Sequence, residues 1–269
     1  MALAVYNEAV NEFSASIGDV RRYVQFVSVA HHLRPRIGQM LDVGTLQPEH
    51  RNILTNYMSQ KDYSVVPGFN GLIVVIAAGF EQFMRRLLRD GVLWLNRSVV
   101  RFDGMPGHLR HQNLVRSGHA LTSVMDPPAE VDYDYEAICR NLGTCWKGGG
   151  DLVLNADAFT AYLPPLTAKN IEEVLNDRVR VKLDWDAFGR NLEIQKATGQ
   201  TRTRDATKET EARLTDFIKK RNRIAHAGTA GPTTTEEELN SIVTFFEAFV
   251  PVLAANVEEG LKRVMQPGR

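Results

Sequence analysis

The stretch GFNGLIVVIAAGFEQFMRRLLRDGVLWL, residues 68–95, decides the fold class of this chain. Large apolar side chains recur in it every three or four residues, as they do along one face of a helix. These residues are Leu72, Ile76, Phe80, Phe83, Leu87 and Trp94. Gly79 and Gly91 each lower the intrinsic helix propensity by about 1 kcal/mol, so packing must hold the segment. The stretch predicts a long helix that is buried on one side.

A second helical pattern occupies the first thirty residues. Its apolar positions are separated alternately by four and three residues. They are Tyr6, Val10, Phe13, Ile17, Val20, Val24 and Val27. Such a stripe fits a helix lying on its own bundle, or a helix that pairs with another protomer. We favour the first interpretation because three heptads are few for a separate coiled coil.

Helical patterns return in the second half of the chain, at residues 168–179, at 184–196 and from about Lys208 past Ile224. Between them, the polar stretch GQTRTRDATKET (199–210) predicts a loop. A run of threonines, each followed three residues later by a glutamate, predicts a capped start for the last helix within 233–238. Pro251 is expected to kink that helix by removing one backbone donor.

Two Pro-Pro pairs and one Gly-Gly-Gly run interrupt residues 97–167. A helix is expected within this segment, from about His108 to Met125. Short β pieces near Leu152–Leu154 fit the sequence, but no alternating run is long enough for a sheet. The chain is therefore predicted to be all-α. We divide it into an N-terminal helical extension (1–66) and a helical domain (67–269) that carries a loop-rich insertion at about 97–167.

Composition excludes several classes of protein. The 269 residues carry 32 Lys and Arg against 32 Asp and Glu, and 43% of them are hydrophobic, as in an ordinary globular protein. The N-terminus lacks a basic segment followed by a long apolar one, and the run Leu72–Phe80 is shorter than the roughly 20 residues that span a bilayer. We expect a cytoplasmic protein without a membrane partner.

No cofactor or metal is expected either. Cys139 and Cys145 are too few for a disulfide framework and match no zinc spacing, so they are predicted to be ordinary thiols.

The most informative string for function is DFIKKRNRIAHAG, residues 216–228. Its centre holds Arg221, with Asn222 directly after it and His226 five residues on. This string resembles the signature of the HEPN ribonuclease superfamily, in which an Arg, often followed by a polar residue, precedes a His by four to six residues.

Two further segments resemble HEPN proteins in the same order along the chain. The stretch GFEQFMRRLL (79–88) is similar to an early HEPN helix, and NIEEVLNDRV (170–179) followed by WDAFG (185–189) is similar to the middle helix of the RiboL-PSP type. The resemblance covers residues 67–262 and implies a HEPN-like antiparallel helical bundle. It also implies a homodimer in which two motifs converge, and a catalytic role for Arg221, Asn222 and His226.

The residue types fit cleavage of RNA. Histidine titrates near pH ~6.5, so it can take the proton from a ribose 2′-OH or give one to the leaving 5′-oxygen. Arginine stays charged, and its planar fork fits phosphate oxygens. Asn222 and His226 are four residues apart, so an amide that orients the imidazole is expected. Arg221 and His226 are about 140° apart around an ideal helix, which is one reason to expect that two protomers share a site.

Basic residues accompany the motif. Between residues 178 and 226 there are 13 Lys and Arg against 7 Asp and Glu, and Lys219, Lys220 and Arg223 are predicted to bind RNA. Glu81 in the early helix is expected to support the motif or to pair with Arg85 at i+4.

These residues together predict a metal-independent endoribonuclease whose products end in a 2′,3′-cyclic phosphate. The resemblance implies a toxin or antiviral-defence setting, with an antitoxin or regulatory protein as a partner. The alternative is a catalytically inactive HEPN scaffold that binds RNA, a nucleotide or a protein.

Overall fold

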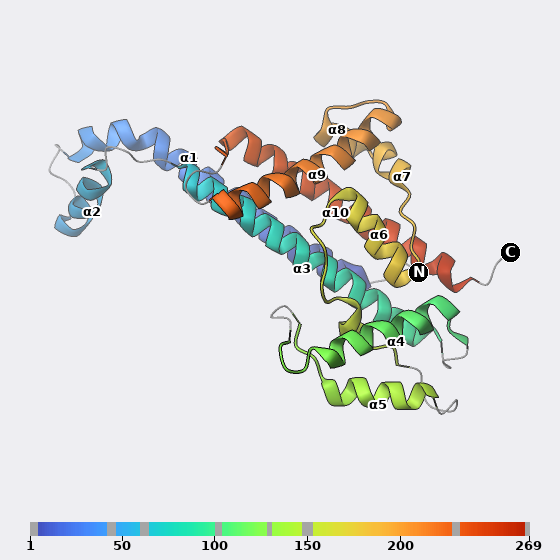
Figure 1. The fold of residues 1–269 in the computed structure, drawn as a ribbon. Helices are drawn as coiled ribbons and strands as arrows, with labels where there is room; N and C mark the ends of the chain where they lie inside the picture. Colours follow the sequence, from blue (N-terminus) through green and yellow to red (C-terminus); the bar gives the residue numbers. More distant parts are fainter. Residues whose placement is uncertain are drawn as a thin grey trace.

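The chain is all-helical in the part that the structure describes. A computed structural model describes residues 5–41, 47–59, 65–99, 104–127, 131–146, 153–227 and 232–266, and these ranges contain no strand (Figure 1). The helices are α1 (Val5–Leu41), α2 (Pro48–Ser59), α3 (Val66–Ser98), α4 (Gly107–Thr122), α5 (Tyr135–Trp146), α6 (Ala168–Val179), α7 (Trp185–Arg190), α8 (Leu192–Thr198), α9 (Thr203–Ala227) and α10 (Glu236–Met265), with one 3₁₀ turn, η2 (Ala156–Phe159).

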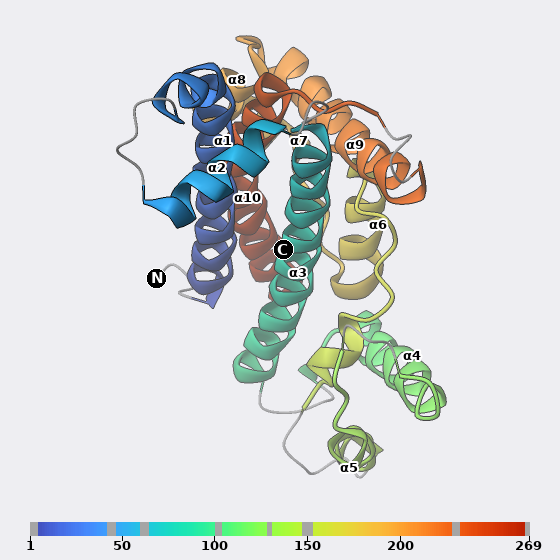
Figure 2. The same cartoon turned by 90° about the vertical axis from the view of Figure 1, so that its left-hand side faces the viewer.

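The centre of the molecule is a layer of three long helices, α1, α3 and α10, which lie side by side in Figure 2. Phenylalanines join them: the ring of Phe80 on α3 lies 6.3 Å from that of Phe13 on α1 and 5.1 Å from that of Phe246 on α10. Phe217 brings α9 onto the same cluster, with its ring 4.8 Å from Phe246 in an edge-to-face contact. The long helix predicted from residues 68–95 is therefore the core helix α3.

The N-terminal stripe belongs to this core. Five of its seven residues are buried, and Val10 and Val27 are partly buried against the same cluster. Its apolar surface is thus covered by α3 and α10 of the same chain, as the first interpretation predicted. The proposed boundary at residue 66 does not separate two cores, because α1 shares one with the rest of the chain. The part of the predicted extension that does project is the far end of α1 together with α2 (Figure 1).

The segment predicted as a loop-rich insertion is more helical than expected. It contains α4, close to the helix predicted there, and also α5, which no pattern in the sequence predicted. A small separate cluster of Ala120, Tyr133, Ile138, Ala158 and Ala161 holds it together. Of the expected β piece at 152–154, residues 153 and 154 are not in a strand, and Leu152 lies outside the described residues. The side-chain amide of Asn96 instead bonds to both backbone groups of Leu154, at 2.8 and 3.0 Å.

The predicted loop at 199–210 is wrong over most of its length, because α9 begins at Thr203. Threonines made the segment look solvent-exposed, yet Thr207 and Thr210 are buried. Each hydroxyl donates to a backbone carbonyl, that of Trp185 at 3.3 Å and that of Ala206 at 2.7 Å. Buried hydroxyl groups with such acceptors carry no large penalty, so the helix tolerates them.

The start of α10 confirms the predicted cap. The hydroxyl of Thr235 accepts a hydrogen bond from the backbone N–H of Glu238 at 3.2 Å. The helix continues to Met265 through Pro251, which lies on its exposed side.

By length and composition, α3 and α10 are apolar enough to cross a membrane. The apolar part of α3 is thus longer than the run Leu72–Phe80 suggested. Core helices have the same composition, and these two supply much of the buried apolar surface here.

Candidate nucleic-acid site

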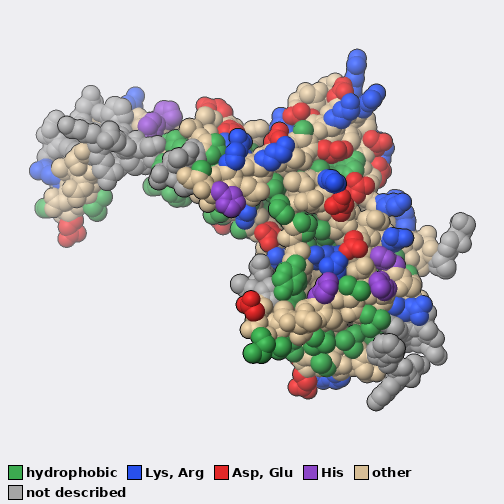
Figure 3. Space-filling view, viewed as in Figure 1, with side chains coloured by type: hydrophobic (Ala, Val, Ile, Leu, Met, Phe, Trp, Pro, Cys, Tyr) green, Lys and Arg blue, Asp and Glu red, His purple; other side chains and the backbone are tan. Residues whose placement is uncertain are grey.

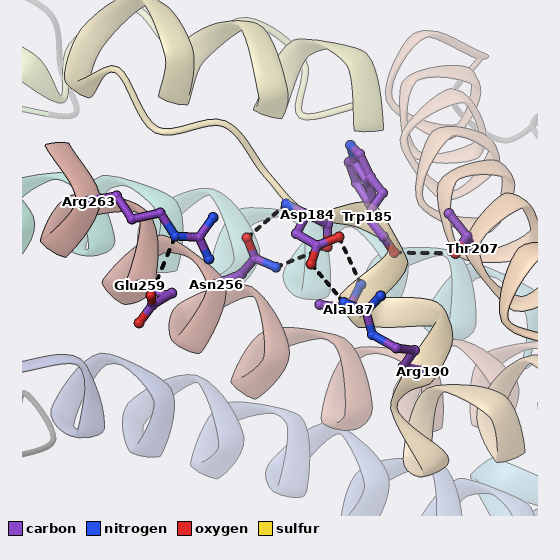
Figure 4. A network of polar contacts seen from close by, with 8 residues as sticks. All are labelled: Asp184, Trp185, Ala187, Arg190, Thr207, Asn256, Glu259 and Arg263. Atoms are coloured by element: carbon purple, nitrogen blue, oxygen red, sulfur yellow. Dashed lines mark hydrogen bonds and ion pairs between the residues drawn. The ribbon is translucent and has the colours of Figure 1, made fainter. Parts of the chain in front are cut away.

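The HEPN-like motif lies in the last two turns of α9. Leu214, Phe217, Ile218 and Ile224 are buried and fix the side of α9 that faces the bundle. A polar network holds α7 between α9 and α10: the amide of Asn256 bonds to both backbone groups of Asp184 at 3.0 Å, and Thr207 donates to Trp185 (Figure 4). The position of α9, and with it the motif, is thus set by its packing and by this network.

Two of the three predicted catalytic residues line one pocket. Arg221 and Asn222 are half-buried and border a cavity of about 150 Å³. Nη1 of Arg221 donates to Oδ1 of Asn222 at 3.1 Å. Glu81 of α3 lines the same cavity, although it is 140 residues away in the sequence. The structure therefore brings Glu81 together with Arg221 and Asn222.

Another wall of this pocket is the segment Leu163–Leu166, which contains Pro164 and Pro165. In the sequence these prolines predicted only a break between elements. Their rigid backbone gives the pocket a fixed wall that faces α9. No pattern in the sequence placed this segment beside the motif, because the two are more than fifty residues apart.

Two buried arginines hold the turn at residues 159–162 that leads into this segment. Arg85 donates to the carbonyl of Thr160 at 2.6 Å and pairs with Glu81 at 2.6 Å, as the i, i+4 spacing predicted. Arg178 donates to the carbonyls of Phe159 and Tyr162, and its burial lowers its pKa to about 10. Tyr162 has a φ of 53°, in a region that bulky residues rarely adopt. Arg178 thus stabilises a backbone turn that is unfavourable by itself.

His226 lies apart from this pocket. It is exposed in the last turn of α9, and within the described residues its imidazole has no hydrogen-bonding partner. The expected bond from Asn222 to His226 is absent from the described contacts, and Oδ1 of Asn222 accepts from Arg221. At about 100° per residue, His226 lies about 40° from Asn222 around the helix axis and about 140° from Arg221. A single chain therefore does not bring Arg221 and His226 together.

The three predicted RNA-binding residues have three different environments. Lys219 is exposed and lies 3.5 Å from the carboxylate of Asp216. Arg223 is exposed on the side of α9 that faces α10. Lys220 differs from the prediction: it is buried, bonds to the carboxylate of Glu238 and donates to the carbonyl of Thr233 at 3.3 Å. Its ammonium group is committed to linking α9 to the start of α10.

The surface around the motif carries cations. Figure 3 shows Lys and Arg side chains interspersed with acidic ones in the region of α9, whereas the first turn of α10 carries Glu236, Glu237 and Glu238. Such a surface attracts phosphates in a salt-dependent way. Among the described residues no group of three or more His, Cys, Asp or Glu side chains is arranged to hold a metal ion.

No family model, curated protein or solved structure matches this chain. The likeness to HEPN proteins rests on the motif and its flanking helices.

Proposed function

We propose that this chain is a HEPN-like endoribonuclease that cleaves RNA without a metal ion. The observation that carries the proposal is the convergence of Glu81, Arg221 and Asn222 on one pocket, with an exposed imidazole one turn farther along the same helix. Helices distant in the sequence meet at the motif, which a chance Arg-x4-His on a surface helix would not require.

In the proposed reaction, an imidazole of His226 accepts the proton of the ribose 2′-OH. The 2′-oxygen attacks the adjacent phosphorus, and the bond to the 5′-oxygen breaks. A protonated imidazole gives its proton to that leaving oxygen, so the products are a 2′,3′-cyclic phosphate and a 5′-OH. The guanidinium of Arg221 stabilises the extra negative charge of the transition state. Such acid–base steps contribute about 100- to 10,000-fold in rate.

One imidazole cannot act as base and acid in the same step, so we propose that two chains form the working site. Two motifs then supply two imidazoles and two guanidinium groups to one phosphate. In this arrangement Arg221 and His226 of the same chain need not act side by side, although they lie about 140° apart around the helix. A homodimer of this kind would be symmetric, with the same patch buried on both chains.

We place the activity in the cytoplasm, in a toxin–antitoxin or antiviral-defence system, where an antitoxin or regulatory protein restrains it. The reason is chemical: unrestrained RNA cleavage arrests the cell that makes the enzyme.

A catalytically inactive scaffold is the second candidate, and the observation that favours it is the exposed, unsupported imidazole of His226. Incubating the purified protein with total RNA in EDTA separates the two. The enzyme predicts fragments with 2′,3′-cyclic phosphate and 5′-OH ends, whereas a scaffold that binds RNA, a nucleotide or a protein predicts intact RNA.

A further inference from the structure

A second pocket lies on the other side of α9, between this helix and α10. Its volume is about 230 Å³, and none of the three predicted catalytic residues lines it. Phe217, Ile242 and Phe245 form its floor, and the two phenylalanines are almost fully buried. The pocket is therefore a preformed apolar hollow at the surface.

The charged side chains that line this pocket are three cations and two carboxylates: Arg213, Lys220 and Arg223 with Asp216 and Glu238. Lys220 is paired with Glu238. Arg213 is engaged as well, since it pairs with Glu209 and donates to the carbonyl of Ala197 at 2.7 Å. Arg223 is exposed and has no acidic partner within the described residues. An apolar floor beside a free guanidinium is the pairing that single-stranded RNA needs, because a base covers the floor while Arg stacks on it or binds phosphate.

The pocket adjoins the proposed cleavage site. Around α9, His226 lies about 40° from Asn222, which borders the first pocket, and about 60° from Arg223, which borders the second. Arg223 is about 4.5 Å before His226 along the helix axis. A strand that crosses α9 over His226 would thus have one pocket on each side.

Size argues for a single base as the occupant. Pockets for drug-sized ligands measure about 300–1,000 Å³, so this one suits a smaller group. A base inside a duplex is stacked on both faces and cannot enter such a hollow.

We infer that the α9–α10 pocket binds one unstacked nucleobase of single-stranded RNA. This inference rests on the proposed function for its substrate class, and names that substrate as single-stranded. Ser241 lies on the rim, so Ser241→Trp fills the pocket. Ala255 is exposed on the same helix, about 21 Å away, and Ala255→Trp is the matched control.

The test measures binding directly, by the fluorescence anisotropy of a labelled eight-nucleotide RNA, with His226→Ala present in every protein to prevent cleavage. The single strand should bind saturably, and its annealed duplex at least about 5-fold more weakly. Ser241→Trp should weaken binding of the single strand roughly 5- to 100-fold. Arg223→Ala, an exposed change that spares the fold, should weaken it by a smaller factor. Ala255→Trp should have no effect.

Equal binding by the Ser241→Trp and Ala255→Trp proteins would overturn the inference, as would equal binding of duplex and single strand, or no saturable binding. Measuring RNA cleavage by the chain with His226 intact tests the proposed function separately from the base pocket. If this chain cleaves RNA while Ser241→Trp does not change binding, only the base pocket is refuted. If binding depends on the pocket but the chain does not cleave RNA, only the proposed nuclease activity is refuted.

Discussion

Lys219 and Lys220 are neighbours in the sequence and differ completely in environment. The side chain of Lys219 is 66% exposed, while that of Lys220 is 9% exposed and is enclosed by Glu238 and Thr233. A basic cluster on a helix thus contains cations of two kinds, because successive residues point about 100° apart. Charge density in the sequence predicts attraction for RNA but does not reveal which cations are available.

The Lys220–Glu238 pair should contribute to stability. Glu238→Ala leaves a buried ammonium with one carbonyl acceptor, which we expect to cost about 1–3 kcal/mol of unfolding free energy. Asp216→Ala breaks the exposed Lys219–Asp216 pair and should cost at most about 0.5 kcal/mol. Chemical denaturation of both variants checks this. Equal losses would mean that the pair is not a stabilising link.

Asp90 gives the stability a dependence on pH. Desolvation raises the pKa of this carboxyl, against the nearby Arg86 and Arg89, which lower it. A carboxyl with a raised folded-state pKa binds protons more tightly in the folded chain. It contributes stability below its unfolded pKa of 3.8, and this contribution is lost as the pH rises through the folded pKa.

Asp90→Asn should therefore raise the thermal midpoint at pH 7, because it removes the cost of a partly desolvated charge. The gain should disappear below about pH 3.8, where Asp90 is protonated in both states. Thermal melts of both proteins across this pH range provide the measurement. A variant that is less stable at pH 7 would show that the arginines outweigh desolvation.

At the scale of elements, the crossing of α7 and α9 positions the motif helix. Gly189 of α7 sits so close to α9 that an added Cβ would lie 2.2 Å from the carbonyl oxygen of Thr203 and 2.3 Å from the hydroxyl of Thr207. The WDAFG segment thus ends in a glycine because the two backbones almost touch.

Gly189→Ala should be strongly destabilising, by more than about 2 kcal/mol, since the backbone of α9 must move. Gly118 of α4 is a helical glycine with open space around its Cβ position, so Gly118→Ala should be neutral or stabilising by up to about 1 kcal/mol. Thermal unfolding of the pair is the check. A Gly189→Ala protein as stable as Gly118→Ala would refute the close crossing.

Periodicity predicted the elements that bury an apolar face, such as α3 and the stripe of α1, because spacing along a helix is a local property. It failed at 203–210, where the buried hydroxyl of Thr207 finds a carbonyl acceptor on α7 and that of Thr210 finds one a turn back in its own helix. It placed Arg221, Asn222 and His226 on a helix, with Arg221 and His226 about 140° apart, but could not show which side of the helix borders a pocket. Nor could it bring Glu81 and Pro164 to the motif, since those contacts arise from the packing of distant helices.

At the scale of the whole molecule, two apolar surfaces that could serve a dimer are occupied within the chain itself. The stripe of α1 and Phe245, Phe246 and Phe249 of α10 are buried within one chain. Apolar side chains remain exposed on another face of α1. They are Tyr23, Phe26, Val29 and Leu33. The proposed reaction needs a second imidazole, so a second copy of this chain is the partner we assign to this face.

Light scattering should then give about twice the 30.2 kDa mass of one chain. Phe26 is 70% exposed, so Phe26→Asp should leave the fold intact, shift the mass toward the monomer and reduce cleavage in parallel. Gln25→Asp, also exposed on α1, is the control. A monomer that cleaves RNA would contradict the proposal that two chains share one site.

RNA cleavage by the His226→Ala protein in EDTA tests the central claim most directly. His119, exposed in the last turn of α4, provides the matched control His119→Ala. We predict that His226→Ala lowers the rate at least about 100-fold with an unchanged thermal midpoint, while His119→Ala cleaves like the unmodified chain. Equal cleavage by both variants, or activity that vanishes in EDTA and returns with magnesium, would contradict the account.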